Sequence, residues 1–183
     1  MPLLSKEPDL HPLELLSAPP QDGLWWVMYT LARREKELMR RLLAKQISFY
    51  APVFEQSYRS PAGRRRSSFL PLFPNYVFVH GLEVDRYQAV ATGCVSRCIE
   101  IPDQQSLTRD LQGIHRLLSS GLDVTAESRL HPGQFVRVKN GPLAGQIGQV
   151  AEKRGQMRLF VTVNFLQQGA SVEIDGFDLE PWT

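Results

Sequence analysis

The sequence has little cysteine and no long apolar run. Its 183 residues include 2 cysteines, too few for the disulfide framework of a small secreted scaffold. Cys94 and Cys98 form a C-x3-C pair without a second pair or a histidine cluster, so we expect no metal site and no cofactor. No apolar stretch approaches the roughly 20 residues of a membrane-spanning helix, and the first residues do not resemble a secretory leader. The expected location is the cytoplasm, with no membrane partner.

The chain as a whole also has no large excess of positive or negative charge. The 21 Lys and Arg residues nearly balance the 19 Asp and Glu residues, for a net charge of +2. Residues 24–69, however, carry 10 basic and 3 acidic side chains, whereas residues 1–23 and 70–128 each have a net charge of −3. Residues 129–183 have a net charge of +1. The positive field of residues 24–69 therefore indicates an acidic surface or a nucleic acid as the partner of that segment alone.

The segments up to residue 121 predict a proline-rich arm followed by an α+β domain. Residues 1–23 contain five prolines and little periodicity, which indicates a flexible arm. Strand-like and helix-like patterns then alternate, which favours a small antiparallel sheet flanked by helices over residues 24–121. The expected strands are 25–29, 47–56, 72–80 and 95–101, with a loop over 57–68; the expected helices follow Thr30 and Ser106 as N-caps and span 85–91 between them.

The last part of the chain has a different sequence pattern. Residues 122–131 are polar and aperiodic, which predicts a linker. Residues 132–183 contain only strand patterns separated by glycines, expected over 134–139, 148–153, 157–165 and 170–174. Several short strands in about 50 residues fit a small closed β-barrel, because closure removes exposed edges.

The most specific motif lies in this second domain. The segment Pro132 to Val150 resembles the KOW motif, a strand, a glycine turn and a second strand, and so implies an SH3-like β-barrel. Gly141 suits the tight turn before Pro142, and Gly148 allows two backbones to approach closely.

A second motif lies upstream. Residues 71–79, PLFPNYVFV, together with the aromatic run at 25–29 and Ala51-Pro52-Val53, resemble the N-terminal domain of the NusG family. Asn75 in the LFPNY segment is the form seen in RfaH-like members, which favours a specialised paralogue over a general factor. The two resemblances together cover residues 24–183 in the order of the family.

The resemblance implies a transcription elongation or antitermination factor that is not an enzyme and is expected to act as a monomer. Its N-terminal domain would bind the clamp helices of RNA polymerase and suppress pausing, and its KOW domain would recruit ribosomal protein S10 or Rho. The family positions that bind polymerase correspond to Trp26, Phe73, Pro74, Tyr76 and Phe78. Arg86, Tyr87 and Gln88 stand where the family contacts the gate loop, in place of the threonine cluster of RfaH-like members, and Phe165 stands at the partner-binding position of the barrel.

Each of these assignments has a plainer alternative. The aromatic residues could fill the core of their own domain, because only one face of a strand can be exposed. Arginine side chains could contact DNA near the transcription bubble or could be a solvated surface; the candidates are Arg33, Arg34, Arg40, Arg64, Arg65 and Arg66. The alternative function is an RNA- or ribosome-binding KOW protein that does not bind polymerase. An enzyme is least favoured, because no nucleophile-elbow, phosphate-loop or metal-ligand spacing is present.

Overall fold

The computed structural model describes residues 6–130 and 132–183, which belong to two compact units, Met1–Gln104 and Gln105–Thr183. The expected class, α+β with antiparallel sheets, is confirmed. The division between the units falls at the start of the last helix, whereas the sequence placed the end of the first domain at residue 121. No helix among the described residues is long and apolar enough to cross a membrane.

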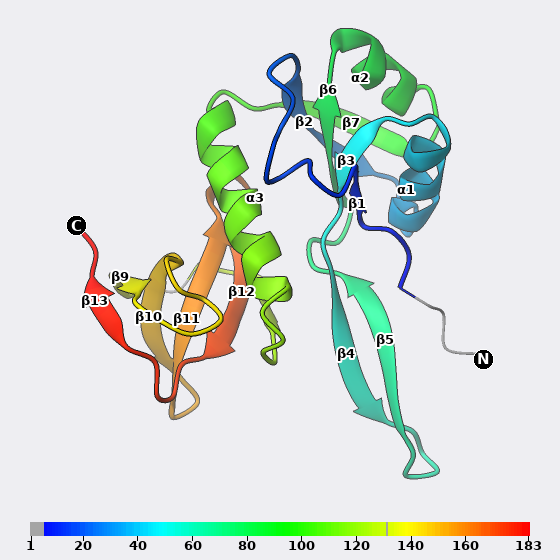
Figure 1. Ribbon diagram of the computed structural model, residues 1–183. Helices are drawn as coiled ribbons and strands as arrows, with labels where there is room; N and C mark the ends of the chain where they lie inside the picture. Colours follow the sequence, from blue (N-terminus) through cyan, green and yellow to red (C-terminus); the bar gives the residue numbers. More distant parts are fainter. Residues whose placement is uncertain (1–5, 131) are drawn as a thin grey trace. The chain divides into compact units, whose positions relative to one another are not determined.

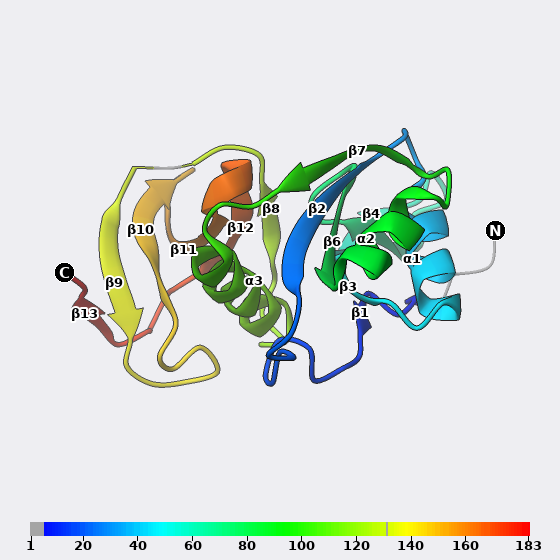
Figure 2. The ribbon, with the colours of Figure 1, turned by 90° about the horizontal axis from the view of Figure 1, so that it is seen from above.

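The first unit is built on a five-stranded antiparallel sheet with the strand order β1-β3-β6-β2-β7 (Figure 1). Helices α1 and α2 cover one face of this sheet (Figure 2). The elements are β1 (Leu10–His11), β2 (Leu24–Thr30), α1 (Glu35–Ala44), β3 (Ser48–Tyr50), β6 (Tyr76–Gly81), α2 (Glu83–Val90) and β7 (Val95–Glu100).

Strand alternation and helix periodicity direct the same side chains into one core. Trp26 and Met28 from β2 meet Val77 and Val79 from β6, and each is 5 % exposed or less. The apolar face of α1 closes over them with Leu38, Met39 and Leu42. Burial of each such side chain stabilises the fold by about 1.5–3 kcal/mol, so the aromatic run in β2 defines the centre of this unit.

The helix starts differ from the expected ones. Thr30 does not cap α1: it is the last residue of β2 and is buried, and the chain turns through Arg33 at φ 62° before α1 begins at Glu35. Helix α2 begins at Glu83 rather than at residue 85, and the Leu82 N–H donates to Asp85 Oδ2 over 2.8 Å. The helix α3 spans Gln104–Leu118, so Ser106 lies inside it.

The proline-rich N-terminal segment is ordered where the structure describes it, which corrects the prediction of a flexible arm for residues 6–23. Leu10 and His11 pair with Tyr50 and Phe49 as strand β1. Leu15 and Leu16 are buried. The composition is typical of an arm, but three leucines bury enough apolar surface to hold the segment against the sheet.

Residues 57–68 are not a loop, as the sequence suggested, but most of a β-hairpin. Strands β4 (Val53–Arg59) and β5 (Arg65–Pro71) pair in register over seven residues and project from the first unit (Figure 1). Ser60 closes the tip, where its N–H donates to the Arg64 carbonyl over 2.8 Å and its Oγ accepts from the Arg64 N–H over 3.2 Å. Gly63 takes φ 75°, which a residue with a side chain adopts at a cost.

The second unit contains a six-stranded antiparallel sheet with the order β13-β9-β10-β11-β12-β8. The elements are α3, β8 (Thr125–Glu127), β9 (Gln134–Val138), β10 (Ile147–Lys153), β11 (Gln156–Val163), a 3-10 turn (Asn164–Leu166), β12 (Gln168–Glu173) and β13 (Leu179–Pro181). Inward side chains of β9, β11 and β12, including Val138, Leu159 and Val172, are buried. The four strands expected after residue 132 are present, whereas the predicted linker 122–131 contains strand β8.

Helix α3 belongs to the second unit. Its Asp110 Oδ2 accepts a hydrogen bond from the Asn164 N–H over 2.9 Å. At Gly113 an added Cβ would lie 3.1 Å from Val161 Cγ1, so the absence of a side chain allows the helix to approach the sheet.

Candidate interaction surfaces

The LFPNY segment forms a tight turn that enters β6. Asn75 adopts a left-handed conformation at φ 69°, which asparagine tolerates better than most residues. Its N–H donates to Glu35 Oε1 over 2.8 Å, and its carbonyl accepts from the Thr30 N–H over 2.8 Å. These two bonds connect the turn to the start of α1 and to the end of β2, and they fix the direction of the flanking residues Pro74 and Tyr76.

The aromatic residues around this turn fall into two groups. Trp26, Phe73 and Phe78 are buried, and the rings of Phe73 and Phe78 meet edge to face with centroids 6.0 Å apart. Pro74 is exposed and Tyr76 is half-buried. Trp26 belongs to the core cluster with α1, and the area offered to a partner comes from Pro74 and Tyr76.

Two residues that the sequence did not single out complete this area. The Tyr29 ring contacts that of Tyr76 with centroids 5.2 Å apart, and the Arg97 guanidinium lies 5.7 Å from the centre of the Tyr29 ring. Cation–π contacts of this kind hold a guanidinium over an aromatic face. We call the group formed by Tyr29, Pro74, Tyr76 and Arg97 the tyrosine surface.

Helix α2 exposes apolar side chains on its outer side. Tyr87 is 69 % exposed, and Val84 and Val90 lie three residues before and after it. Neighbours at this spacing share one side of a helix. Arg86 instead forms an ion pair with Glu83, and Gln88 is half-buried. Of the three gate-loop candidates, Tyr87 is thus the most available.

The arginines of α1 are already engaged within the protein. Arg40 donates two hydrogen bonds to Glu7, Nε to Oε2 over 2.9 Å and Nη2 to Oε1 over 2.7 Å, and this pairing lowers the pKa of the Glu7 carboxyl. Arg34 and Arg41 both pair with Glu37. Their positive charges are partly neutralised, so they offer less to an external anion.

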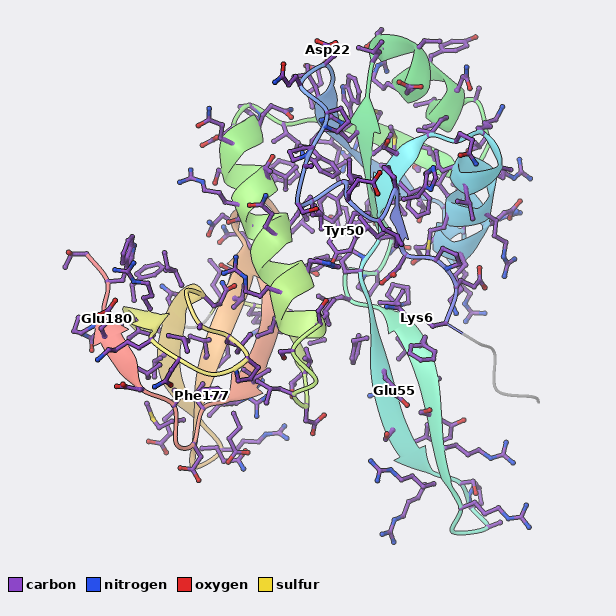
Figure 3. The ribbon with its side chains drawn as sticks, viewed as in Figure 1. Lys6, Asp22, Tyr50, Glu55, Phe177 and Glu180 are labelled. Atoms are coloured by element: carbon purple, nitrogen blue, oxygen red, sulfur yellow. The ribbon has the colours of Figure 1, made fainter. Side chains whose placement is uncertain are left out.

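The hairpin arginines are arranged differently. Within the part of the chain that the structure describes, Arg64, Arg65 and Arg66 form no ion pair, and all three are exposed. Arg59 stands directly opposite Arg65, and the half-exposed Tyr58 stands opposite Arg66. Like charges facing each other across a ladder are unfavourable unless an anion lies between or beside them. Basic side chains project from the far end of the hairpin, beyond Glu55 (Figure 3).

Arg33, Gly141 and Phe165 lie on turns, whereas Gly148 lies in strand β10. Arg33 is exposed beside the start of α1. Gly141 adopts φ 81° in the turn after β9, and a Cβ at Gly148 would lie 2.6 Å from the Phe160 carbonyl oxygen. Phe165 is 41 % exposed in the turn between β11 and β12. On β9 and after β13, Phe135 and Trp182 are also exposed, and the Arg137 guanidinium lies 4.4 Å from the centre of the Trp182 ring.

A comparison with models of known protein families identifies the family of this chain. A family model described as "Transcription termination factor nusG" matches residues 23–126, more than half of the chain. The chain belongs to the NusG family. The match covers the five-stranded sheet except β1, the hairpin and helices α1, α2 and α3, and members of the NusG family are transcription factors rather than enzymes. A search of curated proteins finds no match.

In this NusG-family chain, the residues that sequence reasoning missed are Tyr29, Arg97, Tyr58 and Arg59. Tyr29, Tyr58 and Arg59 each lie next to a residue that was found, and Arg97 lies against Tyr29, but these pairings run across strands and are not visible along the sequence. Within residues 6–130 and 132–183, His, Cys, Asp and Glu side chains form no group of three that could hold a metal ion.

Proposed function

We propose that this NusG-family transcription factor binds the clamp helices of RNA polymerase through the tyrosine surface and acts in elongation or antitermination. The observation that carries the proposal is the LFPNY turn, which leaves Pro74 exposed and leads directly to Tyr76, whose ring contacts that of Tyr29. Tyrosine and arginine are enriched among the residues that dominate binding energies at protein interfaces, and tyrosine buries a large area at a low entropic cost. Tyr87 on α2 serves as a second contact, toward the gate loop.

The hairpin is proposed to contact nucleic acid near the transcription bubble. Its unpaired arginines suit phosphates, and Tyr58 offers a ring on which a base can stack. The C-terminal sheet, which we assign to the SH3-like barrel of the KOW type, would recruit ribosomal protein S10 or Rho through Phe165. The Asn75 form of the turn favours a specialised paralogue.

Co-purification with RNA polymerase tests the central proposal. Tyr76→Ala should lower polymerase retention at least tenfold, as is typical of hot-spot residues, while the unfolding midpoint changes little. Phe135→Ala is the matched control, because it removes an exposed aromatic ring from the other unit. Full retention by Tyr76→Ala and by Pro74→Ala would contradict the assignment of this surface.

A second candidate is an RNA- or ribosome-binding protein that does not require polymerase. It is favoured by Trp182 and Phe135, two exposed rings beside Arg137 on the C-terminal sheet. RNA binding that is lost in Trp182→Ala, combined with no polymerase retention in the wild type, would favour this function over the first.

A further inference from the structure

The hairpin β4–β5 is a two-stranded sheet of its own, separate from the five-stranded sheet of the first unit (Figure 1). The chain enters it from β3 through Ala51 and Pro52. A two-stranded ribbon is marginally stable by itself, so its direction depends on how its base is held. At about 3.3 Å per residue, its seven-residue strands carry the tip roughly 20 Å from the base, and a tilt of about 20° would move the tip by about 7 Å.

The N-terminal segment holds the base of β4 through one residue, Asp9. The Asp9 carbonyl accepts a hydrogen bond from the Ala51 N–H over 2.7 Å, and Asp9 Oδ2 accepts a longer one from the Val53 N–H over 3.4 Å. Ala51 and Val53 are both buried, and Pro52 between them has no N–H. Asp9 therefore receives the backbone donors on both sides of the point where the chain passes from β3 to β4.

The ladder of the hairpin explains why the Val53 N–H needs this acceptor. The Leu72 N–H donates to the Pro52 carbonyl over 2.8 Å. Hydrogen-bonded and non-hydrogen-bonded pairs alternate in an antiparallel ladder, so the next pair, Val53 and Pro71, directs its backbone groups away from the partner strand. A buried N–H that points outward requires an acceptor from another part of the fold, and Asp9 supplies it.

Asp9 is itself fixed by its neighbours along the chain. Before it, Glu7 accepts two hydrogen bonds from Arg40 of α1, and Lys6 Nζ lies 3.3 Å from Asp9 Oδ1. After it, the buried Leu10 begins strand β1, which pairs with β3. Asp9 is thus connected to α1 on one side and to the five-stranded sheet on the other.

We propose that residues 6–16 are a brace that fixes the direction of the hairpin, with Asp9 as the positioning residue. Lys36 of α1 holds the other strand, because its Nζ donates to the Phe69 carbonyl over 3.3 Å. The consequence for binding rests on the proposed function. A fixed hairpin presents its tip arginines to nucleic acid in one place, and it loses little conformational entropy on binding.

Residual dipolar couplings of the backbone amides in the full chain test the brace, because they report how rigidly the hairpin is oriented relative to the five-stranded sheet. In the wild type, one alignment should fit both sheets. In Asp9→Ala, the couplings of β4 and β5 should shrink by roughly a third relative to those of the five-stranded sheet, which is the difference between rigid and flexible backbone. Asp9→Asn keeps a side-chain oxygen for the Val53 N–H and should preserve the rigid orientation.

Glu14→Ala is the matched control, since it removes an exposed carboxylate from the same segment with the same change in charge. Couplings of β4 and β5 that are unchanged in Asp9→Ala would overturn the inference, and so would an equal loss in Glu14→Ala. If Asp9→Ala does not fold by circular dichroism, Asp9→Ser replaces it, because the hydroxyl lies one bond nearer the backbone and does not reach the Val53 N–H.

Binding of a fluorescent DNA duplex with a central unpaired bubble separates positioning from charge. Asp9→Ala should bind this DNA about three- to tenfold more weakly than Glu14→Ala, because its hairpin must be ordered on binding, and the salt slope should stay the same because the arginines are kept. Equal affinities despite shrunken couplings would overturn the role in binding. A wild type that does not bind this DNA, together with couplings that shrink in Asp9→Ala, would contradict the proposed nucleic-acid contact and support the brace.

Discussion

The Asn75 N–H donates to Glu35 Oε1 over 2.8 Å, so the first residue of α1 holds the LFPNY turn in its left-handed conformation. Glu35 is 8 % exposed, so the bond lies largely away from water. Loss of the acceptor would leave a poorly solvated N–H in a strained turn. The bond therefore couples the stability of the first unit to the shape of the tyrosine surface.

Removal of this acceptor should be costly. We expect Glu35→Ala to lower the free energy of unfolding in urea by about 1–3 kcal/mol, whereas Glu35→Gln, which keeps a side-chain oxygen, should cost less. Glu37→Ala is the control, because its ion pairs with Arg34 and Arg41 lie at the surface, where screening by solvent leaves such pairs a small net contribution to stability. Equal losses for the two alanine variants would argue against a special role for Glu35.

The hairpin arginines should govern the salt dependence of nucleic-acid binding. Each phosphate contact contributes a slope of about −0.7 to −0.9 in a plot of log K against log salt. Replacement of Arg64, Arg65 and Arg66 with alanine should therefore flatten the slope by about 2. Replacement of Arg40 and Arg41, which are paired with Glu7 and Glu37, should change it much less. Equal slopes for the wild type and for both sets of arginine replacements would indicate that the hairpin arginines are a solvated surface without a role in binding.

Gly148 should tolerate no side chain. A Cβ would lie 2.6 Å from the Phe160 carbonyl oxygen and 2.9 Å from Leu159 Cδ1, so β10 and β11 would have to separate. Overpacking of this kind costs about 1–3 kcal/mol, which a thermal melt of Gly148→Ala would reveal. Gly155→Asn serves as the control: the site is open, and asparagine accepts its φ of 76°. A melting temperature lowered equally in both variants would contradict the close-approach explanation.

His80 should make stability depend on pH. Its ring lies beside that of Trp25, with centroids 5.0 Å apart, and burial lowers the pKa of His80 below the ordinary 6.5, against the opposing charge of Asp85. Below pH 6.5 the unfolded chain then binds more protons than the folded one at this site. The free energy of unfolding should decrease as the pH falls through 6.5, and the loss should level off below the folded-state pKa.

Urea unfolding between about pH 7.5 and 5.5 measures this dependence. His80→Gln should reduce it, while His11→Gln should leave it in place. If the wild type and His80→Gln lose stability in parallel, the dependence arises elsewhere in the chain.

The sequence predicted the elements that are tied together by buried apolar residues. Strands β2 and β6 and helix α1 follow from aromatic runs and leucine spacing, because burial requires those patterns. The hairpin β4–β5 was not predicted, because its strands carry polar and basic residues and are held by backbone pairing rather than by burial. Strand β8 was not predicted, because it is short and pairs with β12, which lies far from it along the chain.

The candidate site divides in the same way. Pro74 and Tyr76 were found through a motif, whereas Tyr29 and Arg97 gain their place only from the pairing of β2 with β6 and β7. Trp26, Phe73 and Phe78 belong to the motif but lie inside the unit. A motif conveys which residues a turn requires, and only the sheet register decides which of them reach the surface.

The projecting hairpin has a consequence for how this protein can diverge. Most residues between Glu55 and Arg66 are exposed, so substitutions among them change folding stability by about 0.5 kcal/mol or less. Selection can therefore alter the charge and length of the hairpin without lowering the folding stability of the first unit. Related factors that share the same five-stranded sheet could acquire different binding targets through changes in the hairpin alone. Exchange of residues 54–70 between two such factors should then transfer the binding preference.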